Sequence, residues 1–182
     1  MKKQLMYFGL VLVALVFSGC AAFSPPPLDK QNMVPKSSEL VLKPTGKSIA
    51  LGTFEGPRGK GQNIYLITVH DLKSIIAEGL KNSQLCSAVA SEAQTNLDYT
   101  LTAKIKGQPG SGIVTVTVEF LVDYELKRNS TGETVFSQRI TGKQSVSTGE
   151  AFVGVTRARL AVEGAARDNV KQLLENLSKL QL

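Results

Sequence analysis

The sequence predicts an α+β fold, a two-layer sandwich in which an antiparallel sheet carries two helices on one face. Two observations predict it. Apolar and polar residues alternate with a period of two through residues 97–106 and 113–127, which is typical of strands with one buried face. From about Glu150 the apolar period changes to 3.6, as in a long amphipathic helix. Helices on one face of such a sheet form two layers, in the order β-α-β-β-β-β-α.

The chain begins with the parts of a secretory signal peptide. Two lysines follow Met1, and thirteen uncharged residues, 5–17, form an apolar centre. A run of this length is too short to span a hydrocarbon core, which needs roughly 17–25 helical residues. We therefore assign residues 1–19 to a signal peptide and exclude them from the fold.

The end of the signal, Phe17-Ser18-Gly19-Cys20, resembles a bacterial lipobox, although Phe17 stands where Leu or Val is more usual. The resemblance implies that the Cys20 thiol is joined to diacylglycerol, that cleavage precedes Cys20, and that the new amine is acylated, with palmitate among the expected chains. Residue 21 is Ala, not the Asp that favours inner-membrane retention. The resemblance thus implies the periplasmic face of the outer membrane. The alternative is a secreted protein with a stray cysteine.

Residues 20–46 are predicted to be a lipidated, proline-rich tether. They contain a triproline at 25–27, with Pro35 and Pro44 further on, and triproline favours extended polyproline geometry. A short strand at 40–42 is possible at the end of the tether. Residues 47–182 then form a single periplasmic domain, long enough to bury a core.

The first half of that domain is predicted to be a strand, a loop, a helix and a second strand. The first strand covers residues 47–54. The helix begins at a capping box in which Thr68 caps and Asp71 stands three residues on. Its apolar face is formed by Val69, Leu72, Ile76 and Leu80. A short strand at 85–89 follows.

The second half is predicted to be an antiparallel meander followed by the long helix. The strands are 97–106, 113–127 and 133–146, with a turn at 129–132. The outward face of this sheet is expected to carry Lys104, Lys106, Thr115, Thr117, Glu119, Asp123, Arg139 and Lys143. The helix stripe consists of Val155, Val162, Ala166, Val170, Leu173, Leu177 and Leu180.

No catalytic, cofactor-binding or metal-binding constellation is expected in this domain. His70 is the only histidine, and it is expected to be exposed beside the helix cap, without a nucleophile or second ligand nearby. Glu119 and Asp123 lie four residues apart on one strand, roughly 13 Å at about 3.3 Å per residue. That separation is too wide for paired catalysis, so cross-strand ion pairs are expected instead. We predict that the protein is not an enzyme.

Two weaker candidate sites are a basic loop and a lone thiol. The loop 56–61 lacks the Lys-Ser/Thr pair of a phosphate-binding loop, yet Arg58 and Lys60 could contact an anionic headgroup or an acidic partner. Cys86 lies among apolar residues and is expected to be a buried, inert thiol. An intermolecular disulfide is the alternative.

The charge of the chain is mildly basic, with a formal net charge of +6 that includes Lys2 and Lys3 of the signal. This charge is compatible with contact to anionic lipid, lipopolysaccharide or protein. No basic run with interleaved aromatic residues is present, so no nucleic-acid partner is expected.

The whole chain resembles small bacterial outer-membrane lipoproteins, in layout the YajG-type lipoproteins and more loosely the N-terminal domain of TolB and the penicillin-binding-protein activator lipoproteins. The matching segments are the lipobox, the first strand and helix, Leu97-Asp-Tyr-Thr-Leu, and the helix containing residues 161–169. The resemblance implies a non-enzymatic envelope lipoprotein and assigns a role only to Cys20.

From these features we expect an accessory module, anchored in the outer membrane through acyl chains on Cys20, that docks on another envelope protein and aids an assembly or transport machine. Its exposed strand face, or an open sheet edge, would be the docking surface. The alternative is a lipid- or lipopolysaccharide-binding transport-auxiliary lipoprotein, which would need an apolar cleft between sheet and helices.

Overall fold

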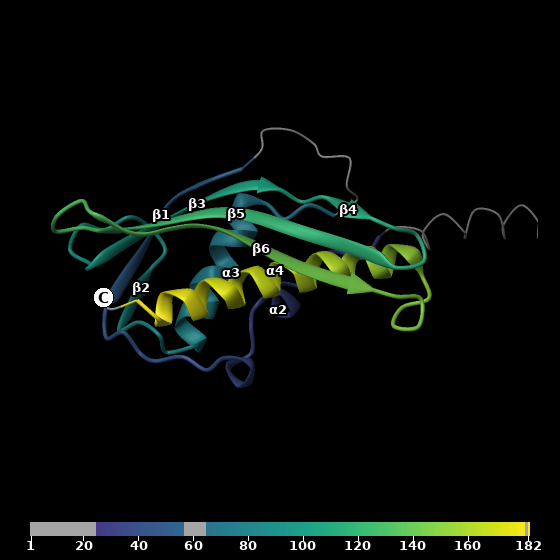
Figure 1. Cartoon of the computed structure of the whole chain (residues 1–182), viewed down its shortest axis with the longest axis horizontal. Helices are drawn as coiled ribbons and strands as arrows, with labels where there is room; N and C mark the ends of the chain where they lie inside the picture. Colours follow the sequence, from purple (N-terminus) through teal and green to yellow (C-terminus); the bar gives the residue numbers. More distant parts are fainter. Residues whose placement is uncertain (1–24, 57–64, 181) are drawn as a thin grey trace, which may run out of the picture.

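The computed structural model describes residues 25–56, 65–180 and 182. They form one mixed six-stranded sheet with the helices on one face, confirming the α+β class (Figure 1). In chain order the elements are α2 (Lys30–Met33), the 3-10 helix η2 (Ser37–Glu39), β1 (Ser48–Glu55), α3 (Val69–Asn82), β2 (Ala88–Ala90), β3 (Tyr99–Gly107), β4 (Gly110–Ser111), β5 (Val116–Arg128), β6 (Thr134–Val146) and α4 (Gly154–Ser178).

The sheet is mixed, so the prediction of an antiparallel sheet was wrong for one half of it. The strands lie side by side in the order β2-β1-β3-β5-β6, and the short β4 pairs with the beginning of β5. β1 runs parallel to both β2 and β3, because α3 carries the chain back to the end where β1 began. The predicted meander of the three long strands is confirmed: β3, β5 and β6 pair antiparallel.

The predicted start of the first long helix is confirmed, whereas the second begins later than expected. The Thr68 hydroxyl accepts a hydrogen bond from the Asp71 backbone N–H at 3.1 Å, and the Asp71 carboxylate accepts one from the Thr68 N–H at 3.2 Å. This capping box begins α3 as expected. α4 begins four residues later than predicted, because residues 147–150 form a turn in which the Ser147 N–H and hydroxyl donate to the Glu150 carboxylate.

The main core lies between α4 and the inner face of β5 and β6. The inward residues of β5 are Val118, Phe120, Val122, Tyr124 and Leu126, none more than 5% exposed. α3 packs beside α4 and covers β1 and β2, so both predicted helices lie on one face of the sheet, as Figure 1 shows.

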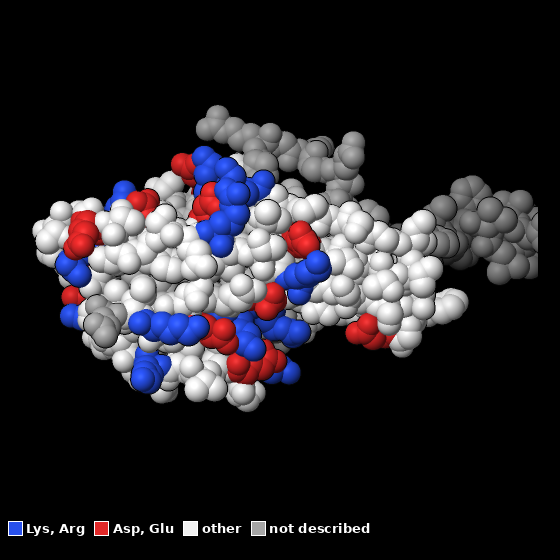
Figure 2. Space-filling view, in the orientation of Figure 1, with Lys and Arg blue, Asp and Glu red and all other residues white. Residues whose placement is uncertain are grey.

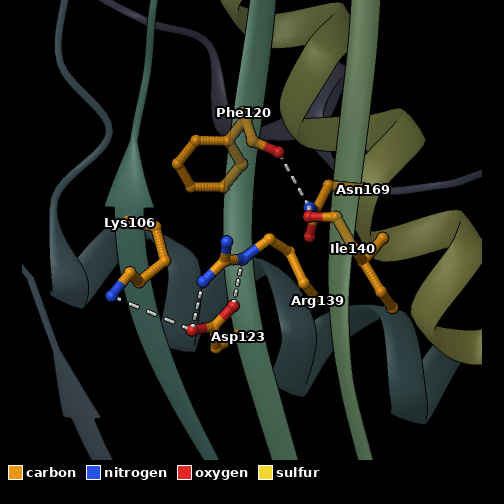
Figure 3. Close-up of polar contacts among 6 residues, drawn as sticks. All are labelled: Lys106, Phe120, Asp123, Arg139, Ile140 and Asn169. Carbon is orange, nitrogen blue, oxygen red and sulfur yellow. Dashed lines mark hydrogen bonds and ion pairs between the residues drawn. The ribbon is translucent and has the colours of Figure 1, made fainter.

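The seam between α4 and β6 is closed by a glycine and an asparagine. A Cβ on Gly142 would collide with the Ala165 carbonyl and the Asn169 backbone nitrogen, so the two backbones touch there. Asn169 is fully buried. Its amide donates to the Phe120 carbonyl at 3.0 Å (Figure 3) and to the Ile140 carbonyl at 2.9 Å. It also accepts a 2.6 Å hydrogen bond from the Tyr124 hydroxyl.

The segment expected to be a tether differs from an extended linker over much of its described length. Met33 is fully buried in the core, in the short helix α2. The Asp29 N–H and the Asn32 side-chain amide both donate to the Glu163 carboxylate, at 2.8 and 3.0 Å. Leu40 and Leu42 also pack on the core, and no strand forms there. Burial of Met33 and the bonds to Glu163 therefore place this segment on α4.

Removing the Asn169 side chain tests the seam. Asn169→Ala leaves the buried Tyr124 hydroxyl without its acceptor and removes two hydrogen bonds from α4 to sheet carbonyls, and we expect it to lower the free energy of unfolding by about 2–4 kcal/mol. Asn176→Ala, on an outer part of the same helix, should change it by less than about 0.5 kcal/mol. Urea denaturation measures both. Equal, small losses in the two variants would contradict the assignment of Asn169 as the link between α4 and the sheet.

Candidate functional site

Three of the predicted site residues, Cys20, Arg58 and Lys60, lie outside the described residues. The lipid attachment at Cys20 and the anionic contact at Arg58 and Lys60 therefore stay predictions. His70 is described, and it is exposed at the start of α3, as expected. No group of three or more His, Cys, Asp or Glu side chains that could hold a metal ion occurs in the described part of the chain.

The outer face of the sheet carries the predicted cross-strand ion pairs. Arg139 donates two hydrogen bonds to Asp123, at 2.6 and 3.0 Å, and the Lys106 ammonium lies 4.0 Å from the same carboxylate (Figure 3). Lys143 binds Glu119 at 2.9 Å. The hydrogen bonds from Arg139 lower the pKa of Asp123. Each carboxylate is thus paired with a cation of a neighbouring strand, which confirms the structural interpretation of the pair.

The exposed edge of the sheet at β6 is partly occupied. The Lys143 backbone N–H donates to the Asp168 carboxylate at 2.9 Å, and the Gln172 side chain donates to the Thr141 carbonyl at 3.1 Å. Two backbone groups that an added strand would need are therefore bonded to α4. The opposite edge strand, β2, has only three residues. The face of the sheet is a better docking surface than either edge.

One end of the molecule exposes apolar side chains. The loop before β5 presents Ile113 and Val114, 87% and 68% exposed, and the loop before α4 presents Phe152 and Val153, 89% and 56% exposed. We call these four residues the apolar end. In Figure 2 this end, at the right, is mostly uncharged, whereas lysines and arginines gather over the middle and the other end. A group of exposed apolar side chains marks an interaction site.

Arg157 joins the two loops of the apolar end. Its guanidinium donates to the carbonyls of Ala151 at 2.8 Å, Phe152 at 2.6 Å and Ile113 at 2.9 Å. The side chain is only 7% exposed, and among the described residues no carboxylate lies within ion-pair distance of it. One buried cation thereby holds both loops against the first turn of α4.

A cavity of about 480 Å³ lies beside the apolar end, between the sheet and the start of α4. Its walls are mainly apolar, formed by Val116, Val118, Ala158 and Val162 among others. Tyr65 also lines it, and the buried Tyr65 hydroxyl has no hydrogen-bond partner among the described residues. The volume falls within the range of small-ligand sites.

Sequence reasoning missed both the apolar end and the cavity. The sequence predicts a strand at 113–127, which includes Ile113 and Val114, and a helix from about Glu150, which includes Phe152 and Val153. In the structure β5 begins at Val116 and α4 at Gly154, so both apolar pairs lie in loops. The signal that could have found the two pairs is the glycine next to each, Gly112 and Gly154, because glycine weakens a strand or helix and favours a turn.

No protein-family model and no curated protein matches the sequence. Solved structures match the fold. Protein XCC0632 from Xanthomonas campestris, of family DUF330, is 13% identical over 80% of this chain and 90% of its own, with a TM-score of 0.58. PelC from Paraburkholderia phytofirmans, a dodecamer, is 17% identical over 76% of this chain and 91% of its own, at 0.50. Hypothetical protein CT253 from Chlamydia trachomatis is 9% identical over 72% and 98%, at 0.51. These likenesses show a shared fold.

The described helices include none that is both long and apolar enough to cross a membrane. The similarity to YajG-type lipoproteins stays a prediction.

The reactivity of Cys86 tests whether this thiol, the only one among the described residues, is shielded from solvent. Cys86 is half-buried in the loop between α3 and β2, and burial raises its pKa to about 12. At pH 8 a thiol with that pKa is almost wholly protonated, and the thiolate is the reactive form. In a Cys20→Ala chain we expect native Cys86 to react with a disulfide reagent at least ~100-fold more slowly than the urea-unfolded chain. Equal rates would show that the thiol is open to solvent and would revive the intermolecular disulfide.

Proposed function

We propose that this chain is a non-enzymatic lipoprotein of the outer membrane, anchored on the periplasmic face through Cys20, that binds and assists an envelope assembly or transport machine. The observation that carries the proposal is the outer face of the sheet. All described helices lie on the other face, so three long strands present an exposed surface with both signs of charge.

The composition of that face suits a protein partner. Its charges are already paired across the strands, and Leu121 is a half-buried apolar side chain between Glu119 and Asp123. Exposed ion pairs contribute little to stability, about 0–1 kcal/mol each. They are better suited to select a partner by complementary charge.

The fold likeness supports a protein that works in an assembly. PelC, with a similar fold, is a dodecamer, although fold alone does not assign function. The absence of an enzymatic role is part of the proposal. It is supported by the engagement of Glu119 and Asp123 in ion pairs rather than with a nucleophile or base.

Site-specific crosslinking in cells tests the accessory role. A photo-reactive residue at Thr141, exposed on the outer face opposite Leu121, should capture one stoichiometric envelope protein. The same residue at Glu78, exposed on α3, is the matched control and should not. Capture should be lost in a Cys20→Ala chain, because the anchor concentrates the domain at the membrane.

Capture of the same protein from both positions, or of none, would contradict docking through the outer face. Enzymatic turnover abolished by one point mutation would contradict the non-enzymatic role.

A second candidate function, transport of a lipid or lipopolysaccharide, is favoured by the cavity between the sheet and α4. If the cavity holds an acyl chain, the chain purified in mild detergent should carry about one bound lipid, by native mass spectrometry. Ala158→Phe, which fills the cavity, should remove it. Ala88→Phe, at an exposed site on β2, should not. Equal lipid content in the two variants would exclude the cavity as a carrier site.

A further inference from the structure

We infer that the apolar end is a membrane-docking tip, whose four side chains enter the same phospholipid leaflet that holds the acyl chains of Cys20. The inference rests on the anchor in the proposed function and adds a second contact with the bilayer. Two contacts with the bilayer would fix the orientation of the domain. The apolar end then lies against the membrane, and the outer face of the sheet is free for a partner.

The local structure forces these side chains outward. Gly112 has a φ of +96°, and a Cβ there would collide with the Thr115 carbonyl. This tight turn places Ile113 and Val114 at its tip. Because Arg157 bonds the carbonyls of Ile113 and Phe152 together, the second apolar pair is held next to the first. The apolar end is thus built from two loops held in place, not from a single mobile loop.

The path of the N-terminal segment points to the same end. Thr45 is bonded to Leu85, just beyond α3, and shares a surface hollow with residues 178–180 at the end of α4. Pro35 packs by Gly79, near Val170 and Leu174. Asp29 bonds to Glu163. Followed toward its N-terminus, the chain therefore runs along α4 toward the beginning of that helix.

The anchor must lie close to this end. In Figure 1 the purple start of the described chain lies where α4 begins. Cys20 is five residues before Pro25, and five extended residues reach at most about 18 Å. The acyl chains therefore bring a bilayer to the end of the molecule that exposes Ile113, Val114, Phe152 and Val153.

The charge distribution agrees with insertion into a bilayer. Arg157, the cation beneath the apolar end, is buried and bonded to carbonyls. Glu150 is the acidic residue nearest to Phe152 in the sequence. Its carboxylate accepts hydrogen bonds from the Ser147 N–H and hydroxyl. Interfacial segments place apolar side chains at the boundary of headgroups and acyl chains and keep charged groups out of it.

A tryptophan reporter tests the inference, since the sequence contains no tryptophan. The full, lipidated chain carrying Phe152→Trp is reconstituted into phosphatidylcholine vesicles with or without brominated acyl chains. The control is Ser130→Trp, an exposed site in the turn at the far end of β5, roughly 40 Å from the apolar end at about 3.3 Å per residue. Flotation of the vesicles reports the anchor separately.

We expect brominated lipid to quench the fluorescence of Phe152→Trp about two-fold or more, since interfacial side chains enter roughly 5–10 Å. Ser130→Trp should be unaffected. Adding Val114→Asp to Phe152→Trp should abolish the quenching while the chain still floats.

Three results would overturn the inference. If the chain floats but neither tryptophan is quenched, the lipid anchor is retained and the insertion of the apolar end into the bilayer is contradicted. A Phe152→Trp emission that is blue-shifted but not quenched would assign the apolar end to a protein contact, such as a second copy of this chain. A chain that does not float would overturn the anchor and the tip together.

Discussion

The close approach of α4 to β6 at Gly142 is the constraint on which the rest of the structure depends. Only a residue without a side chain allows the Ala165 carbonyl and the Asn169 nitrogen to reach the strand. At that distance the Asn169 amide can bond carbonyls of both β5 and β6. A buried polar side chain with all its partners in place specifies one position of the helix, because any shift would break these bonds and leave the buried Tyr124 hydroxyl unpaired.

Once α4 is positioned, its other faces organise the remainder of the molecule. Arg157, Glu163 and Asn169 are spaced by six residues, and at 3.6 residues per turn they point in three directions about 120° apart. Asn169 bonds the sheet, Glu163 bonds the N-terminal segment, and Arg157 bonds the loops of the apolar end. A single helix therefore relates the sheet, the approach of the anchor and the exposed apolar residues.

This arrangement divides the surface by chemistry. The outer face of the sheet carries paired charges. The apolar end exposes four apolar side chains and is mostly uncharged in Figure 2. The domain would then contact a membrane through the apolar end and a protein through the outer face at the same time. The cavity opens close to the apolar end, so a lipid carrier would take its cargo directly from the bilayer.

The sequence by itself determined the features that depend on neighbouring residues. Period-two alternation located the long strands, the Thr68–Asp71 pair located the start of α3, and the outward charges of β5 and β6 were predicted with their cross-strand pairing. Tertiary structure decided the parallel pairing of β1, the packing of Met33, and the meeting of two apolar loops over Arg157. The physical reason is that periodicity and capping act within one turn or strand, whereas strand partners and loop contacts depend on which distant segments α4 brings together.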